Sequence, residues 1–361
     1  MRILSVVGTR PNFVKIAPLV KEMARYPDLY TVLVHTGQHY DESMSAQFFT
    51  ELSIPSPDFN LDVRAASHAV QTAEVMRRLD PVLEETRPDL LLVVGDVNST
   101  LAAALTAVKR GIPVAHVEAG LRSFDRAMPE EINRVLVDAI SEWLFVTERS
   151  GQENLLHEGR PADKIHFVGN VMIDALRMFQ PGWQASPIFE NLGIDAGQPY
   201  AVLTLHRPSN VDEPAVLARL LQALTRVARE IPVMFPVHPR VREQLRSQGL
   251  GFIGKAISCL DPLGYLDFIA LLSRARLVLT DSGGVQEETT VLGVPCLTLR
   301  SSTERPVTVE HGTNRVIGTD PAVIVNAVIE TLDKRPQAPT PPPLWDGLAA
   351  QRIVKILMSS G

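Results

Sequence analysis

The chain has 361 residues and is 45% hydrophobic, about twice the length of one typical domain and enough for a sizeable core in each half. Its formal net charge is −6 and its Lys and Arg residues are scattered, which excludes the basic stripe used to bind nucleic acid or anionic membranes. The first residues enter an apolar strand without a cleavable signal pattern, and no apolar run approaches the roughly 20 residues that span a bilayer, so we expect a cytoplasmic protein. Cys259 and Cys296 fit no disulfide or metal pattern and are expected to be buried thiols.

Short β-branched runs alternate with amphipathic stretches in the first half. RILSVV at 2–7 is followed by apolar residues at helical spacing up to Met23. Further strands are expected at TVLVHTG, LLLVVG, IPVAHVE, EWLFVTE and KIHFVGN. This βαβα pattern predicts a parallel sheet covered by helices on both faces.

The pattern breaks at 180–199 and restarts with YAVLTLH, IPVMFPVH, AISCL, RLVLTD and VPCLTL. The predicted fold is therefore α/β, with two Rossmann-like domains facing each other across a cleft. We place a hinge at 169–173, the first domain at 1–170 and the second at 171–346. The proline-rich segment QAPTPPPL precedes a helix at 347–361, which we expect to cross back onto the first domain.

Polar residues directly after apolar runs are the candidates for a site, because ligands of open parallel sheets bind beyond the carboxyl ends of the strands. Any one of them is more simply a helix cap or an ordinary strand-end group. Several in one sequence favour a ligand site. They are Arg10, Asp96, Glu118, His206, His238 and Asp281.

The segment TDSGGVQEE at 280–288 predicts an anion site. Gly283 and Gly284 let the backbone approach a ligand, and a helix beginning near Val285 directs free N–H groups toward an anion such as a diphosphate. Glu288 is placed to accept hydrogen bonds from ribose hydroxyls. The simpler alternative is a glycine turn with a solvated acidic first turn.

GTRPNFVK at 8–15 is a second strand-to-helix turn, with Arg10 and Lys15 about one turn apart. Arg10 is a candidate phosphate ligand. The chain contains neither GxGxxG nor GxxxxGK[ST], so a dinucleotide site and a P-loop are both disfavoured.

Carboxylates form a second group of candidates. Asp96, Glu118 and Glu131 are suited to inverting a carbon centre, because one face needs a base and the other an acid. Glu130 is better explained as a residue of a helical first turn. A metal site of Asp96, Glu118 and His116 lacks any known ligand spacing, so no metal is expected.

Histidines divide into two groups by their position. His35, His116 and His166 lie in or beside apolar strands and are expected to be core groups with satisfied hydrogen bonds. His206 and His238 follow strands and are the candidates for a functional role.

Motifs between residues 8 and 306 occur in one characteristic order. They are GTRPNFVK, TGQHYD, GDVNST, HVEAGLRS, MPEEINR, VGNVMID, TLHR, HPR, TDSGGVQEE and RSSTERP. Together they resemble the non-hydrolysing UDP-N-acetylglucosamine 2-epimerases over nearly the whole chain. The resemblance implies a fold like the glycosyltransferase type B fold, a homodimer, a UDP-sugar substrate, and neither a metal nor another cofactor.

The reaction that this resemblance implies interconverts UDP-GlcNAc and UDP-ManNAc. UDP leaves by anti elimination to give 2-acetamidoglucal and is added back syn, with the C2 proton returned to the other face. Asp96, Glu118 and Glu131 match the acid and base carboxylates, and His206 matches a histidine near the diphosphate. The implied UDP ligands are Arg10, Lys15, His238, Ser282, Gly283, Gly284 and Glu288.

Two motifs depart from the common family pattern. TLHRPSN lacks the acidic residue of TLHRxEN, which affects the contacts near His206. TGQHYDESM differs from TAQHR and favours the branch that resembles UDP-2,3-diacetamido-glucuronic acid 2-epimerases. It also leaves open a second, regulatory UDP-sugar site.

Three alternatives share the UDP site. A glycosyltransferase of the same fold needs one base and an acceptor surface, not three carboxylates. A non-catalytic UDP-sugar sensor would not need the carboxylates and His206. A hydrolysing relative would release UDP and free N-acetylmannosamine.

Overall fold

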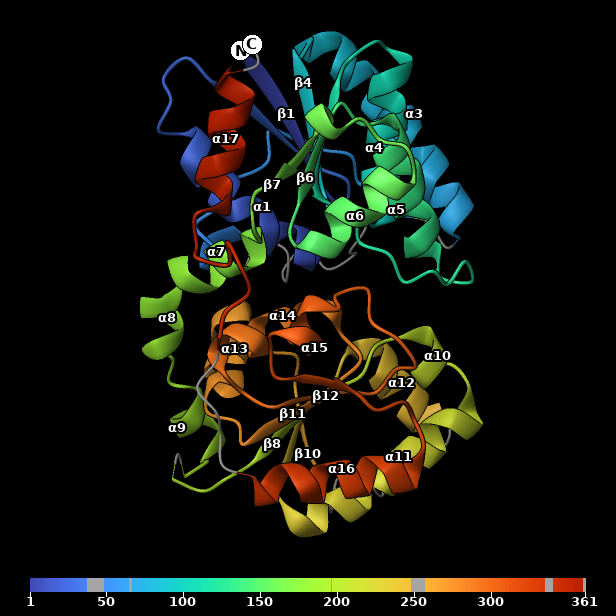
Figure 1. The fold of residues 1–361 in the computed structure, drawn as a ribbon, viewed down its shortest axis with the longest axis vertical. Coiled ribbons are helices and arrows are strands. Elements are labelled where there is room, and N and C mark those ends of the chain that lie inside the picture. Colours follow the sequence, from blue (N-terminus) through green and yellow to red (C-terminus); the bar gives the residue numbers. More distant parts are fainter. Residues whose placement is uncertain (38–48, 65–66, 196, 248–256, 335–339, 360–361) are drawn as a thin grey trace. The chain divides into compact units, whose positions relative to one another are not determined.

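The computed structural model describes residues 1–37, 49–64, 67–195, 197–247, 257–334 and 340–359. The chain forms two compact units (Figure 1). The first comprises Met1–Met178 with Pro343–Gly361, and the second is Phe179–Pro342. Each unit is an α/β structure with its own parallel sheet, as the alternating pattern predicted.

The sheet of the first unit has the strand order β3-β2-β1-β4-β5-β6-β7, and every neighbouring pair is parallel. Its strands are β1 (Arg2–Val7), β2 (Tyr30–His35), β3 (Phe59–Asn60), β4 (Leu90–Val94), β5 (Val114–Ala119), β6 (Trp143–Val146) and β7 (Ile165–Phe167). The central strands are buried along their whole length, which explains their continuous apolar runs.

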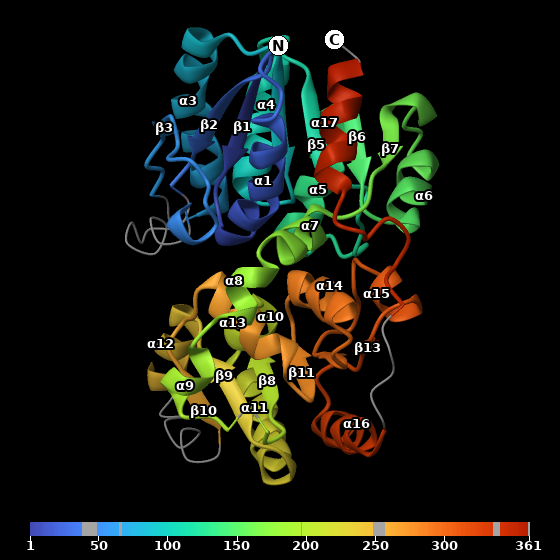
Figure 2. The same ribbon diagram turned by 90° about the vertical axis from the view of Figure 1, so that its left-hand side faces the viewer.

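Helices cover both faces of this sheet (Figures 1 and 2). The described helices are α1 (Arg10–Met23), α3 (His68–Thr86), α4 (Asn98–Lys109), α5 (Pro129–Ile140), α6 (Arg149–His157), the 3₁₀ turn η1 (Ala162–Lys164), α7 (Val171–Met178) and α17 (Ala349–Ser359). One packed group is α1 with α7 and α17, and another is α3 with α4 and α5.

The sheet of the second unit has the order β10-β9-β8-β11-β12-β13 and is also parallel. Its strands are β8 (Ala201–Thr204), β9 (Val233–Pro236), β10 (Ser258–Leu260), β11 (Leu277–Thr280), β12 (Cys296–Thr298) and β13 (Asn314–Val316). Its described helices are α8 (Gln180–Gln184), α9 (Ile188–Leu192), α10 (Pro208–Val211), α11 (Pro214–Glu230), α12 (Pro239–Ser247), α13 (Tyr265–Ser273), α14 (Gly283–Leu292), α15 (Val307–Glu310) and α16 (Pro321–Asp333).

Helix α11 shows how the second core is built. Leu217, Leu220, Leu221 and Leu224 recur at helical spacing and are all buried in the core that also contains the β8 and β9 side chains. Each buried leucine contributes roughly 1.5–3 kcal/mol through the apolar area it removes from water.

Both sheets reverse their strand order at an equivalent place. In the first unit β1 lies between β2 and β4, and in the second unit β8 lies between β9 and β11. Such switch points leave a crevice at the carboxyl ends of the strands, where ligands of open α/β sheets bind. The turns after β1, β4, β8 and β11 are therefore the places to examine.

The end of the chain belongs to the first unit. Asp174 in α7 accepts hydrogen bonds from the backbone N–H groups of Ala349 and Ala350, at 3.1 and 2.7 Å, and so caps α17. The indole of Trp345 donates to the carbonyl of Thr147 at 3.0 Å. These contacts place α7 with the first unit, so the units divide further along the chain than the expected boundary after residue 170.

Two further expectations concern burial. Cys296 is buried, but the expectation for Cys259 is wrong because that residue is exposed. It lies in β10, which is an edge strand with exposed residues. Among the described residues, no helix combines the length and the apolar character needed to cross a membrane.

Candidate functional site

The turn between β1 and α1 brings two predicted ligands to the end of the first sheet. Asn12 holds this turn to the neighbouring strand, because its Nδ2 donates to the carbonyl of Val94 at 2.9 Å. Arg10 is the first residue of α1 and is half-buried. Lys15 is buried, and a Cβ added to Gly95 would lie 3.2 Å from its Nζ. Lys15 therefore lies against the turn that follows β4.

Glu118 has an unusual backbone in β5. Its φ is +75°, and the pairing of β5 with β6 shifts register between Val117 and Ala119. A bulge of this kind redirects a side chain, and the left-handed conformation costs of order 1–3 kcal/mol in a residue other than glycine. The buried carboxylate forms an ion pair with the Nζ of Lys15. The fold thus holds Glu118 in a strained position beside the Gly95 turn.

Asp96 and Glu131 are brought together by Arg134, a buried residue of α5. The Nε and Nη2 of Arg134 lie 2.9 and 2.8 Å from Asp96 Oδ2. Its Nη1 lies 2.7 Å from Glu131 Oε2. Asp96 keeps 21% of its side chain exposed, so a ligand can reach it. Three predicted carboxylates are thus held by two cations, Lys15 and Arg134.

Glu131 also orders the loop before α5. It accepts hydrogen bonds from the backbone N–H and the hydroxyl of Ser123, at 2.8 and 2.9 Å, and from the backbone N–H of Phe124 at 3.0 Å. Glu131 is buried and Glu130 is partly exposed. The two neighbouring glutamates therefore have different surroundings, as the sequence analysis expected.

His116 and Asp138 form a fully buried pair that braces two of these turns. The Nε2 of His116 meets the carbonyl of Gly95 at 2.9 Å, so that nitrogen must carry a proton. Its Nδ1 lies 2.6 Å from Asp138, which also accepts from Gly120 N–H at 3.0 Å and pairs with Arg122 at 2.8 Å. Burial alone would raise the pKa of Asp138, but His116 and Arg122 lower it overall. His116 is a core histidine, as expected.

His35 and His166, the other two histidines expected in the core of this unit, differ in burial. His35 is buried with its ring 5.3 Å from that of Phe13, and burial lowers its pKa. His166 is only half-buried and lies 5.6 Å from the Phe145 ring, and burial lowers its pKa too. The expected burial is confirmed for His35, but its Nε2 has no hydrogen-bond partner among the described residues, so the expectation of satisfied hydrogen bonds is wrong there. For His166 the expected burial holds only in part.

In the second unit, His206 follows β8 and is held by Asp281, which follows β11. The Nδ1 of His206 lies 2.8 Å from Asp281 Oδ1. The carboxylate also accepts from Arg207 N–H at 3.0 Å and from Asn210 Nδ2 at 3.1 Å. Asp281 is buried, whereas 45% of the His206 side chain is exposed. Burial alone would raise the pKa of Asp281, but His206 and the backbone donors lower it overall.

The glycine turn after Asp281 has the geometry of an anion site. Ser282 is the N-cap of α14, which begins at Gly283 and not near Val285 as expected. Helix N-termini of this kind offer free N–H groups and a favourable dipole to phosphate. A Cβ at Gly283 would clash with the guanidinium of Arg305, so the close packing of that arginine requires glycine.

Three arginines and two glutamates gather beside this turn. Glu304 is bound by Arg305 at 2.6 Å, by Arg300 at 2.7 Å and by Arg207 at 3.4 Å. Arg305 also pairs with Glu287 at 2.7 Å. With Asp281, which directly precedes Ser282, three carboxylates balance the three arginines, so the free N–H groups at the start of α14 are what favour an anionic ligand there.

Glu288 lies in the second turn of α14 and is buried. Burial and the neighbouring Glu287 raise its pKa to about 8, while a hydrogen bond from Tyr265 opposes the shift. Glu288 is therefore mostly protonated at neutral pH. The ionised form accepts hydrogen bonds at both oxygens, whereas the protonated form donates from one of them.

His238 is exposed at the end of β9, where its carbonyl accepts from the N–H of Arg242 at 3.0 Å. It is therefore at the same sheet edge as His206, as the strand-end pattern predicted. The TGQHYD motif is described only as far as Gly37, so its remaining residues lie outside the described part of the chain.

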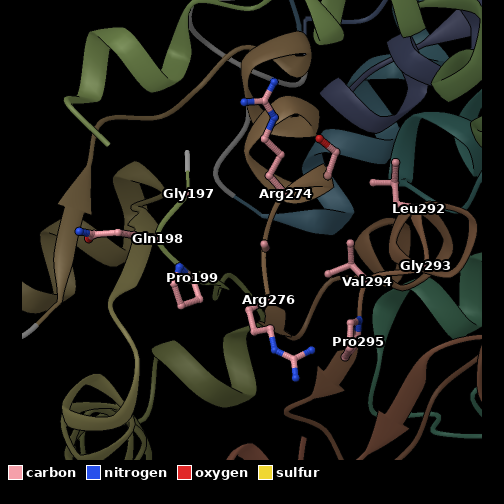
Figure 3. A pocket seen from close by; sticks show the side chains of 11 residues that line it. Gly197, Gln198, Pro199, Arg274, Arg276, Leu292, Gly293, Val294 and Pro295 are labelled. Carbon is pink, nitrogen blue, oxygen red and sulfur yellow. The ribbon is translucent and has the colours of Figure 1, made fainter. Parts of the chain in front are cut away.

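A shallow hollow of about 330 Å³ lies at the amino ends of the strands of the second sheet, away from the carboxyl ends where the candidate residues lie (Figure 3). Pro199, Arg276 and Pro295 line it, directly before β8, β11 and β12. The guanidinium of Arg276 already donates a hydrogen bond to the carbonyl of Leu332, at 2.8 Å. This hollow is at the amino ends of the strands and contains none of the predicted site residues.

Sequence analysis missed the residues that position the candidates. Arg134 stands three residues after Glu131 in MPEEINR, a helical spacing that could have suggested the pair. Asp138 carried no recognisable signal, whereas Arg305 belongs to the RSSTERP motif but was given no role. Across the described ranges, no group of three His, Cys, Asp or Glu side chains is arranged to hold a metal ion.

Comparisons with known proteins agree over nearly the full length. The family model described as UDP-N-acetylglucosamine 2-epimerase matches residues 21–358. A UDP-N-acetylglucosamine 2-epimerase of Methanococcus maripaludis is 40% identical over 98% of this chain and 97% of its own length. A UDP-2,3-diacetamido-2,3-dideoxy-D-glucuronate 2-epimerase of Pseudomonas aeruginosa is 42% identical over 92% of this chain and 93% of its own. The crystal structure of Methanocaldococcus jannaschii UDP-GlcNAc 2-epimerase, in complex with UDP-GlcNAc and UDP, has a TM-score of 0.94, 39% identity, and coverage of 99% of this chain and all (100%) of that one.

Proposed function

This chain belongs to the UDP-N-acetylglucosamine 2-epimerase family, and we propose that it is an isomerase that interconverts UDP-N-acetylglucosamine and UDP-N-acetylmannosamine. In the proposed reaction a base removes the C2 proton while UDP leaves C1, which gives 2-acetamidoglucal. UDP then adds back to C1 and a proton returns to the opposite face of C2. The same two bonds break and re-form, so no oxidant or reductant is consumed.

The arrangement of carboxylates in the first unit carries this proposal. Asp96 lies in the turn after β4, Glu118 near the end of β5 and Glu131 in the first turn of α5. Lys15 and Arg134 hold these three carboxylates in place. Inversion at C2 needs proton-transfer groups for both faces of the sugar, and each such group typically contributes about 10²- to 10⁴-fold to the rate.

The second unit supplies the proposed UDP site. The α14 N-terminus at Ser282, Gly283 and Gly284 would hold the diphosphate through its free N–H groups and its dipole. Glu288 would accept from the ribose. The further ligands that we propose are Arg10, Lys15 and His238, and His206 would act at the leaving diphosphate.

A solvent-exchange experiment tests the reaction. Purified protein incubated with UDP-GlcNAc in deuterium oxide should form UDP-ManNAc with deuterium at C2, followed by proton NMR. Product that carries only protium at C2 after full conversion would exclude exchange through these carboxylates. A glycosyltransferase or a hydrolase would instead release UDP without returning an epimerised UDP-sugar.

The substituents at C3 and C6 of the sugar distinguish the alternative substrate. The Pseudomonas aeruginosa relative is named for a diacetamido-glucuronate sugar and is as similar to this chain as the Methanococcus maripaludis relative. The same NMR assay with both UDP-sugars separates them. Turnover of the diacetamido sugar alone would replace UDP-GlcNAc as the substrate and leave the reaction type unchanged.

We also propose that the chain forms a homodimer through α5. Ile132, Val135 and Leu136 are exposed apolar residues on this helix. An exposed apolar stripe is typical of an interface. Wild-type protein should sediment as a dimer, and Val135→Glu with Leu136→Glu as a monomer. Val323→Glu on α16, also an exposed valine, is the matched control and should leave the dimer intact.

The expected cytoplasmic location stays a prediction that cell fractionation can test.

A further inference from the structure

Asp281 lies at the centre of the hydrogen bonds that hold His206. Its Oδ1 faces His206 Nδ1 at 2.8 Å, and both of its oxygens lie 3.1 Å from the His206 backbone nitrogen. Its Oδ2 accepts from Arg207 N–H and from the side chain of Asn210. One buried carboxylate therefore fixes both the backbone and the ring of a partly exposed histidine.

The position of the pair in the sheet connects it to the proposed UDP site. Strands β8 and β11 are neighbours at the switch point, with Thr204 paired to Thr280. Asp281 directly precedes Ser282, the N-cap of α14. The carboxylate thus joins the His206 turn to the glycine turn, and the ring lies at the edge where the diphosphate is proposed to bind.

Hydrogen-bond chemistry decides which ring nitrogen is available. An ionised carboxylate only accepts, so His206 Nδ1 must carry a proton. Because Nδ1 faces the buried Asp281 carboxylate while 45% of the His206 side chain is exposed, Nε2 is the ring nitrogen directed away from Asp281. A proton on Nε2 in addition to the one on Nδ1 makes the ring a cationic donor.

We propose that Asp281 is a positioning residue that keeps a proton on Nδ1 of His206 and directs a charged Nε2–H toward the departing diphosphate. This inference rests on the proposed epimerase reaction. As the C1–O bond breaks, negative charge grows on the terminal phosphate of UDP, and an oriented imidazolium stabilises it more than it stabilises the intact sugar nucleotide. No proton passes through Asp281, because its role is to set the tautomer, charge and direction of the ring.

Asp281→Asn tests this role with little change in volume. The amide introduced by this substitution can keep its oxygen toward Arg207 N–H and place its NH₂ group opposite His206 Nδ1. The ring would then accept at Nδ1 and become neutral. Loss of one charged hydrogen bond is worth roughly 1.5–3 kcal/mol, so kcat should fall about tenfold to hundredfold with KM nearly unchanged.

Nitrogen-15 NMR of histidine-labelled protein gives a readout that a merely structural role would not produce. Wild-type His206 should show a protonated Nδ1, and the Asp281→Asn variant an unprotonated Nδ1. An unprotonated Nδ1 in the wild-type protein would overturn the proposal even if the variant did not fold. If the wild type epimerises no UDP-sugar, the proposed function fails, while this spectrum still tests the pair.

A double-variant cycle completes the test. If Asp281 acts through His206, adding Asp281→Asn to His206→Gln should lower kcat no further than His206→Gln alone. Asn210→Ala removes a different hydrogen bond from the same carboxylate and should keep both the wild-type tautomer and most of kcat. Additive losses in the double variant, or a loss in Asn210→Ala equal to that in Asp281→Asn, would show that Asp281 only supports the loop.

Discussion

Each unit contains a histidine bound through Nδ1 to a buried aspartate, and the two pairs differ in what the second ring nitrogen meets. In the first unit, the Nε2 of His116 is satisfied by the carbonyl of Gly95 and the ring is fully buried. In the second unit, the His206 side chain is 45% exposed. A contact of the same kind therefore braces the core in the first unit, through Asp138, and holds a partly exposed ring in the second unit, through Asp281.

Asp138 and Asp281 make similar contacts in the two units. Asp138 joins His116 to the N–H of Gly120, and Asp281 joins His206 to Arg207 N–H. Both carboxylates face a histidine, and for both the pKa is lowered although burial alone would raise it. A buried carboxylate without such a partner behaves in the opposite way: the pKa of Glu288 rises to about 8.

The largest effect on turnover is expected at Glu118, which lies two residues after His116 in β5. Glu118→Gln removes a proton-transfer group with little change in shape, so turnover and deuterium uptake at C2 should fall about 10²- to 10⁴-fold. UDP affinity, measured by calorimetry, should change far less. Glu142→Gln, which removes the exposed pair with Lys164, is the control and should keep full turnover. Equal activity in both variants would remove Glu118 from the mechanism.

Substitution of His116 should lower the melting temperature more than substitution of His206. His116→Phe leaves the buried Gly95 carbonyl without its hydrogen-bond partner, which costs about 1–3 kcal/mol. It also removes one hydrogen bond from the Asp138 carboxylate, worth roughly 1.5–3 kcal/mol, although Gly120 N–H and Arg122 stay bound to Asp138. The melting temperature of the first unit should fall by about 10 °C. His206→Gln should shift it little, because the ring is partly exposed. Scanning calorimetry of both variants gives the comparison, and equal shifts would mean that the two pairs have the same structural role.

Nucleotide binding should depend on the proton of Glu288. Its pKa of about 8 keeps Glu288 mostly protonated at pH 7. In the proposed contact two ribose hydroxyls donate to Glu288, which favours the ionised form because both of its oxygens accept. UDP affinity should therefore rise as the pH increases from 6 toward 8, with release of a proton. Glu288→Gln should bind about tenfold more weakly and lose this pH dependence. Calorimetry in two buffers of different ionisation enthalpy measures the proton, and its absence in the wild type would refute the ribose contact.

Much of the fold and the positions of the candidates were accessible from sequence, for a physical reason. Parallel strands buried on both faces give continuous apolar runs, and their carboxyl ends share one edge, so Asp96, Glu118 and His206 could be found from pattern alone. The predictions that failed depend on contacts between residues that are far apart in the sequence. The pair of His206 with Asp281 needs the adjacency of β8 and β11, and the exposure of Cys259 follows from the edge position of β10.

The smallest expected effect concerns Asp174, the buried carboxylate that caps α17. Burial raises its pKa from 3.8 to about 6, although the N–H groups of Ala349 and Ala350 oppose the shift. The folded state therefore holds this proton more tightly than the unfolded state. The contribution of Asp174 to stability is complete below pH 4 and declines as the pH rises from about 4 to 6. The melting temperature of the wild type relative to Asp174→Asn should accordingly drop by a few degrees between pH 4.5 and pH 7.5.

Asp346 provides the control of opposite sign for that measurement. Its hydrogen bonds with Arg352 lower its pKa, so its contribution is present above its ordinary value near 3.8 and is lost as the pH falls below it. The advantage of the wild type over Asp346→Asn should thus shrink toward low pH, while its advantage over Asp174→Asn grows. Both aspartates lie next to the start of α17, so a general effect of pH on that helix would move both differences in the same direction. Parallel changes would therefore contradict the assignment, and opposite changes would show that the buried Asp174 and the exposed, arginine-paired Asp346 titrate with opposite effects on stability.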